Sequence, residues 1–139
     1  MEEPGLPPLD VTEFDSSLGY AAGNVVSTTT DMICFFNAMI TGSLLPPAQH
    51  RRMWTTVSTE GGYWMPYARY GLGVFEFDEQ VTGGLALRGV GGSLWGSYFF
   101  VVGTRDGRHT VAVYTNTEWK SWDLMFKVVE AEFGVSVGA

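Results

Sequence analysis

The residues best suited to chemistry form a glycine-rich run, GVGGSLWG, at positions 89–96. Glycines let a strand approach a ligand closely, because no side chain stands between the ligand and the backbone. Val90, Gly91 and Gly92 lead to Ser93, whose hydroxyl can hydrogen-bond a carboxylate or carbonyl group. The alternative is purely structural: a tight strand with glycines for packing and a polar serine at its rim.

Outside this run, the single cysteine and the two histidines are the first side chains to weigh as nucleophile, base or metal ligand. Cys34 lies among apolar residues of an expected helix, so we predict a buried and inert thiol. His50 stands beside two arginines and His109 follows an expected turn, so both imidazoles are predicted to be solvated. No set of His, Cys, Asp and Glu has the spacing of metal ligands. We therefore predict no metal and no cofactor.

Three helices are predicted from the spacing of apolar residues. The first spans about residues 28–42 and opens with Thr28 and Asp31, which fit a capping box. A shorter helix begins at Pro46 or Pro47, because proline suits a first helical turn, and it runs to residues 53–54. The last spans about residues 118–133 and presents one apolar face.

Four strands are predicted, each dense in aromatic and β-branched residues: 70–77, 85–90, 97–104 and 110–115. An Asp-Gly pair between the last two favours a hairpin with a primed turn. The predicted fold is therefore α+β: an antiparallel sheet of about 3–4 strands, N-terminal helices, and a C-terminal helix packed on one sheet face.

The chain of 139 residues is of a length suited to one domain. We expect residues 1–18, which hold three prolines and five acids, to form an extended arm, and residues 19–139 to form the domain. A net charge of −7 with only 8 Lys and Arg excludes nucleic acid and anionic membranes as partners. One cysteine excludes an internal disulfide, and no apolar run reaches the length of a membrane span. Residues 1–4 lack the features of a signal peptide, so the chain as given would be cytoplasmic, and we leave its localisation open.

Three stretches in order carry a resemblance to a known family. They are AGNVVSTTTD at 22–31, MWTTV at 53–57 leading to YGLG at 70–73, and the glycine-rich run with the strands that follow it. Over roughly residues 19–134 the chain resembles the C-terminal part of the serine β-lactamase and penicillin-binding protein superfamily. Class C β-lactamases, D-alanyl-D-alanine carboxypeptidases and related esterases share this order, and the Streptomyces-type carboxypeptidases look most similar. The resemblance implies a partial β-lactamase/transpeptidase-like fold, in a family that is often secreted or periplasmic.

The resemblance also implies roles for individual residues. The family's third motif falls on Val90, Gly91 and Gly92, and the next amide, that of Ser93, would form half of an oxyanion hole. Backbone donors of this kind are worth about 3 kcal/mol in the transition state. Trp95 and Phe75 would join these residues in binding substrate.

The departures from the family pattern concern catalysis. Ser-x-x-Lys, which supplies the family's nucleophile, does not occur, and the nearest spacing is Thr117 to Lys120 in the last helix. A literal Tyr-x-Asn at residues 114–116 ends a strand, which is not where the family places that motif. Val90 replaces the family's polar or basic residue, and Phe75 stands where some carboxypeptidases have an arginine. We therefore predict no catalytic side chain in this chain.

The strand Thr110–Thr115 would be left open, because the family strand that pairs with it belongs to the part that this chain lacks. It has no charge or proline to protect it. We expect the chain to homodimerise or to dock a complementary chain through this edge. Alternatively, the arm around residues 9–14 folds back over it.

Three hypotheses for function follow. In the first, the chain is a fragment or subunit of a serine hydrolase and is not an autonomous acyl-transfer enzyme. In the second, it is a stand-alone protein repurposed to bind a small apolar or peptide-like ligand. In the third, it is a non-catalytic interaction module. The second would use an aromatic hollow for binding, non-covalent cyclisation or isomerisation. Filling of the core is the structural alternative for most of these rings, which are Trp54, Tyr63, Trp64, Tyr67, Phe75, Trp95 and Tyr98.

Overall fold

The computed structural model describes residues 7, 9–62, 64–65, 67–116 and 121–137. Within these residues one antiparallel sheet has six strands in the order β1-β2-β3-β4-β5-β6. The strands are β1 Val57–Ser58, β2 Ala68–Tyr70, β3 Phe75–Phe77, β4 Leu87–Leu94, β5 Ser97–Thr104 and β6 Thr110–Thr115. The helices are η1 Ser16–Gly19, α1 Tyr20–Gly23, α2 Thr29–Ile40, α3 Pro47–Met53 and α4 Ser121–Phe133. The α+β prediction is confirmed.

Helix α2 starts where the capping pattern predicted. Thr28 is extended, and its hydroxyl oxygen accepts a hydrogen bond from the Asp31 N–H at 3.1 Å. The same hydroxyl lies 2.9 Å from the Asp31 carboxylate, so the carboxylate bonds the cap's side chain. The helix ends before Gly42, whose φ of 80° is the left-handed conformation that glycine adopts at little cost.

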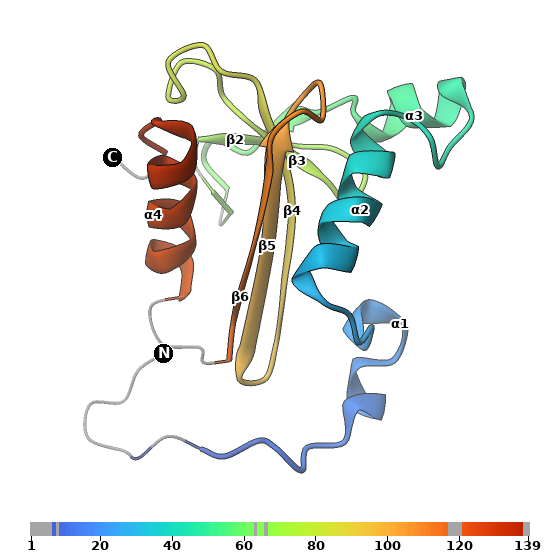
Figure 1. The fold of residues 1–139 in the computed structure, drawn as a ribbon, viewed down its shortest axis with the longest axis vertical. Coiled ribbons are helices and arrows are strands. Elements are labelled where there is room, and N and C mark those ends of the chain that lie inside the picture. The colour runs from blue at the N-terminus through green and yellow to red at the C-terminus, as the bar shows by residue number, and fades with distance from the viewer. Residues whose placement is uncertain (1–6, 8, 63, 66, 117–120, 138–139) are drawn as a thin grey trace.

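The two faces of the sheet are covered by different helices (Figure 1). Helix α4 packs on one face, as predicted, over a core whose buried members are Phe75, Phe77, Leu87, Phe100, Val102, Met125, Val129 and Val137. Helix α2 covers the other face, over a second core of Phe36, Met39, Ile40, Met53, Trp54, Val74 and Val101. The predicted first residues of the last helix, 118–120, lie outside the described residues.

The sheet is larger than the 3–4 strands predicted, because the expected strand at 70–77 is two strands. β2 and β3 pair with each other, and a turn joins them in which the Gly71 N–H donates to the Val74 carbonyl at 2.8 Å. Gly73 has a φ of 76°, which supports the reversal. A Cβ at Gly71 would meet the Met53 carbonyl oxygen, so the backbone of α3 approaches closely there. β1 adds a further strand beside β2.

Two hairpins join the three longest strands. β4 and β5 meet through Trp95 and Gly96, and the φ of 74° at Gly96 allows this two-residue turn. The hairpin between β5 and β6 is confirmed, but its primed turn was wrong. A primed turn needs a positive φ at its first central residue, and type I′ needs one at both, whereas Arg105 and Asp106 have negative φ and only Gly107 of the connection has a positive one. The Gly107 N–H donates to the Thr104 carbonyl within a five-residue connection, 105–109.

Cys34 is a second correction. The thiol was predicted to be buried, but the residue is exposed on α2, because the apolar face of that helix passes through Phe36, Met39 and Ile40. No helix within the described part of the chain is both long and apolar enough to cross a membrane.

Candidate functional site

Strand β4 carries the glycine-rich run, and its two halves have different surroundings. In residues 87–90 buried and half-buried positions alternate, and the strand lies between β3 and β5. The described pairing with β3 ends at Gly89, whereas the pairing with β5 continues to Leu94. Gly91, Gly92 and Ser93 are exposed. The second half of β4 is therefore a strand with one open side.

The pairing register sets the direction of the amides in this second half. Leu94 and Ser97 are partners across the two-residue turn, so they form a hydrogen-bonded pair. Such pairs alternate along an antiparallel ladder, which makes Gly92 the next residue of β4 whose N–H faces β5. The N–H groups of Gly91 and Ser93 therefore point away from β5, toward the side where the described pairing with β3 has already ended.

The glycines of β4 differ in what lies beside them. A Cβ at Gly89 would overlap the ring of Phe75, and one at Gly91 would lie 2.7 Å from Cδ2 of Phe100. A Cβ at Gly92 would meet no described atom within 4 Å. The first two glycines make room for core rings, and Gly92 leaves open space on the α2 side of the sheet.

The remaining predicted site residues lie in three different surroundings. Val90 is half-buried and packs against the α2-side core, in company with Met32. Phe75 is 1% exposed in the α4-side core, so it packs inside the protein instead of lining the exposed wall. Trp95 lies at the β4–β5 turn, 47% exposed, with its ring 4.7 Å from that of Phe14.

The aromatic residues do not line one hollow. Trp54 belongs to the core under α2, whereas Phe75 belongs to the core under α4, on the other face of the sheet. Trp64 packs edge-on against Phe75 and Tyr70. Tyr63 lies outside the described residues. The interpretation that these rings fill cores accounts for Trp54 and Phe75, and the single aromatic hollow was wrong.

Both histidines have partners and are not simply solvated. His50 Nε2 lies 3.1 Å from the carbonyl oxygens of Met39 and Ile40, so an N–H there donates to the C-terminal end of α2. His109 Nε2 lies 2.6 Å from Glu132 Oε1. Neither contact could be read from local spacing, because the partners of His50 lie on α2 and the partner of His109 lies on α4.

An ion-pair cluster at the start of β4 was not foreseen. Arg88 Nε lies 2.7 Å from Glu76 Oε1, and the two side chains are only 13% and 12% exposed. The Arg88 guanidinium also lies over the Trp54 ring, 4.1 Å from its centroid. Arg105 reaches Glu76 at 3.8 Å and Glu79 at 3.3 Å. Cross-strand pairing of Glu76 with Arg88 could have suggested this cluster.

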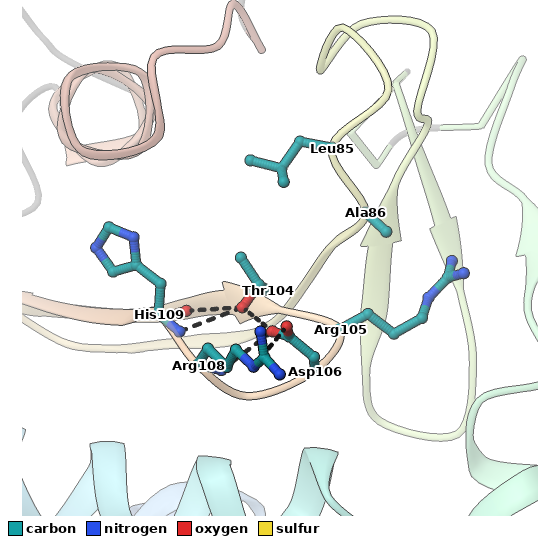
Figure 2. Close-up of a pocket in the computed structure, with 7 residues that line it drawn as sticks. All are labelled: Leu85, Ala86, Thr104, Arg105, Asp106, Arg108 and His109. Carbon is teal, nitrogen blue, oxygen red and sulfur yellow. Dashed lines mark hydrogen bonds and ion pairs between the residues drawn. The ribbon is translucent and has the colours of Figure 1, made fainter.

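The described hollow lies at the far end of β4 from Ser93 (Figure 2). Its volume is about 290 Å³, and its lining residues are Leu85, Ala86, Thr104, Arg105, Asp106, Arg108 and His109. The Thr104 hydroxyl, and then the Arg108 N–H, donate to Asp106 and lower the pKa of its carboxyl below the ordinary value of 3.8. These bonds shape the hairpin, and the glycine-rich run contributes nothing to this hollow.

Neither catalytic motif of the resembled family is completed here. Thr117 and Lys120 lie outside the described residues. Tyr114 and Thr115 end β6, so the literal Tyr-x-Asn stands at a strand end, as expected. Among the described residues no group of three or more His, Cys, Asp and Glu could hold a metal ion.

One prediction was that the arm around residues 9–14 folds back over the open edge of β6. β6 is the last strand in the sheet order, and among the described strands it pairs with β5 alone. The arm does not lie along β6: Val11 meets Gly96 and Phe14 meets Trp95, both at the β4–β5 turn. In Figure 1 the arm passes below the sheet on its way to α1. The alternative in which the arm covers the β6 edge was therefore wrong.

Comparisons with known proteins bear on the fold. No family model matches the chain. A solved structure of a D-stereospecific amidohydrolase from Streptomyces sp. resembles it with a TM-score of 0.64 and 34% sequence identity. The match covers 77% of this chain but 30% of the amidohydrolase, which belongs to the penicillin-binding protein/β-lactamase superfamily. The α+β fold is thus consistent with a partial transpeptidase-like fold.

Proposed function

We propose that this chain is the sheet-bearing part of a serine hydrolase that cleaves amide bonds, and that the nucleophile comes from a segment outside these 139 residues. The observation that carries the proposal is the likeness to the Streptomyces amidohydrolase, at 34% identity over 77% of this chain. The chain spans only 30% of that protein, and its sequence has no Ser-x-x-Lys. An amide-cleaving site therefore needs a second component.

In this proposal the second half of β4 binds the substrate along its open side. The N–H groups of Gly91 and Ser93 point to that side, and no side chain of Gly92 obstructs it. The Ser93 N–H donates to the carbonyl oxygen of the scissile amide and stabilises the negative charge that develops there. A glycine-rich strand suits this role, because its backbone makes the contact.

The complementary segment packs against β6 in this proposal. An edge strand with unpaired backbone groups adds a further strand readily. Thr110–Thr115 has no charge and no proline, and Tyr114 is 58% exposed at this edge. A second copy of this chain would bring no Ser-x-x-Lys, so a complementary chain fits the proposed chemistry better than a homodimer.

The test uses a fluorophosphonate probe, which labels activated serine nucleophiles. The full chain alone should stay unlabelled. Mixed with the remainder of the Streptomyces amidohydrolase chain, expressed as a separate polypeptide, it should restore labelling of that polypeptide and hydrolysis of D-alaninamide. No labelling of the mixture, with association shown by size-exclusion chromatography, would contradict the hydrolase and favour an interaction module. Labelling of this chain by itself would contradict its lack of a nucleophile.

Two substitutions at one position sharpen the role of the Ser93 amide. Ser93→Pro removes the N–H, and because this N–H points away from β5, the ladder is preserved. The reconstituted activity should fall about 100-fold. Ser93→Ala keeps the N–H and should lower the activity by less than about fivefold if the hydroxyl adds one neutral hydrogen bond. Equal losses in both variants would contradict a backbone donor.

A further inference from the structure

Two aromatic residues that are far apart in the sequence meet beside the glycine-rich run. The ring centroids of Phe14 and Trp95 are 4.7 Å apart, with an interplanar angle of 45°. Although they pack together, the two residues remain 45% and 47% exposed. Two large rings that stay half exposed in mutual contact offer a surface suited to a third planar apolar group.

Local hydrogen bonds shape the arm that brings Phe14 to this place. The Asp10 carboxylate accepts from the Thr12 N–H at 2.9 Å and from its hydroxyl at 2.6 Å. The Phe14 N–H donates to the Val11 carbonyl at 3.0 Å, and the Asp15 carboxylate accepts from the Ser17 N–H at 2.9 Å. The arm segment that carries Phe14 thus has a defined turn on either side of it.

The β4–β5 turn is matched to the arm in shape. Gly96 needs its positive φ for the turn, and a Cβ there would lie 2.5 Å from Cγ2 of Val11. Only glycine at this position lets Val11 approach so closely. The two contacts, Val11 on Gly96 and Phe14 on Trp95, hold the arm across the end of the strand that carries Ser93.

We propose that Phe14 and Trp95 form an aromatic subsite that binds the aromatic side chain of a peptide-like ligand lying along the second half of β4. The inference rests on the proposed function for the position of the ligand, and it adds the class of side chain that the site prefers. Trp95 follows Ser93 by two residues, so the subsite adjoins the proposed carbonyl donor. Residues 89–96 carry no charge, whereas the arm carries Asp10, Glu13 and Asp15. This acidic arm disfavours a ligand carboxylate near the subsite and tolerates an uncharged amide or an ammonium group.

The test measures binding to the full chain labelled with 5-fluorotryptophan, with D-phenylalaninamide and D-alaninamide as probes. Trp95→Phe assigns the ¹⁹F resonance of Trp95. We expect D-phenylalaninamide to shift this resonance saturably and to bind about fivefold more tightly than D-alaninamide. Phe14→Ala, which keeps the Trp95 reporter, should abolish the preference. The matched control is Tyr114→Ala, an exposed aromatic residue on β6, which should retain it.

Several outcomes would overturn the subsite. A Trp95 resonance that does not move, a preference that survives Phe14→Ala, or a preference lost in the Tyr114 control would each do so. The binding assay needs no nucleophile, so its failure is separate from that of the proposed function. If the reconstituted mixture is labelled by the fluorophosphonate but the chain shows no preference for D-phenylalaninamide, the subsite alone is refuted. If the chain shows the preference but the mixture is not labelled, the hydrolase alone is refuted.

Discussion

The two halves of β4 show how one strand serves as core and as surface. Residues 87–90 are flanked by strands on both sides, and Leu87 and Gly89 are buried. Residues 91–93 are exposed and are flanked by β5 alone among the described strands. Glycine occurs in both halves but has opposite uses. At Gly89 it admits a core ring, and at Gly92 it leaves the backbone accessible.

This difference teaches that glycine content alone does not define a ligand site. Phe75 fills the space beside Gly89, so that glycine serves packing. Only the second half has both outward-facing amides and open space. Substitutions that separate the two halves test whether stability resides in the first and binding in the second.

The largest expected effect is at Arg88, in the first half. Arg88→Met removes the nearer cation of a largely buried ion pair and leaves Glu76 with only the more distant Arg105, at 3.8 Å, so the free energy of unfolding should fall by about 3 kcal/mol. Urea denaturation followed by circular dichroism measures it. Arg108→Met is the control, because Arg108 is 87% exposed and its pair with Asp106 should contribute under about 1 kcal/mol. Equal losses would mean that the Arg88 pair does not stabilise the first half.

A smaller effect separates two glycines of the same strand. Gly89→Ala forces a Cβ into the Phe75 ring and should cost about 2 kcal/mol of unfolding free energy. Gly92→Ala meets open space and should change it by less than about 0.5 kcal/mol. Thermal unfolding of both variants provides the comparison. If Gly92→Ala were the more destabilising, the second half would not be open.

Amide exchange should reveal the alternation within the second half. The N–H of Gly92 faces β5 and should exchange at least about tenfold more slowly than those of Gly91 and Ser93. In the first half, Gly89 has β3 as a partner and should be protected as well. Hydrogen–deuterium exchange by NMR reads each amide separately. Uniform protection from Gly89 to Ser93 would place another strand on the open side.

The smallest effect concerns pH and the arm. Hydrogen bonds from Thr12 lower the pKa of Asp10, and those from Ser17 lower the pKa of Asp15, both from 3.8. Because the folded pKa is lower than the unfolded one, the stabilisation is present above pH 3.8 and is lost as the pH falls through the folded values. The ¹⁹F resonance of Trp95 should therefore stay constant near neutral pH and move only in acid. If the Trp95 resonance moved between pH 5 and 7, protonation of Asp10 and Asp15 would not be the cause.

Much of the fold follows from local patterns. β5 and β6 begin and end at the predicted residues, because aromatic and β-branched side chains dominate each of them. Thr28 caps α2 through a contact three residues away, which a sequence displays directly. The division of residues 70–77 was missed although its turn is local, because the strand-forming residues on both sides of Gly71 and Gly73 were read as one continuous strand.

The site was harder to predict than the fold. The extension of β4 through three glycine-rich positions depends on β5, which pairs with each of them, and a propensity argument does not include that partner. Phe75 was assigned to the ligand although its ring fills the space beside Gly89. The Phe14–Trp95 contact joins positions 81 residues apart, and no local spacing encodes it.

The surroundings of Val90 limit which residues this position of β4 accepts. Its side chain now packs against the apolar residues under α2, including Met32. A lysine returned to this position would bring a cation into contact with those neighbours, at a free-energy cost that one mutation does not offset. Placing the polar residue of the resembled family at position 90 therefore requires compensating changes in α2 at the same time.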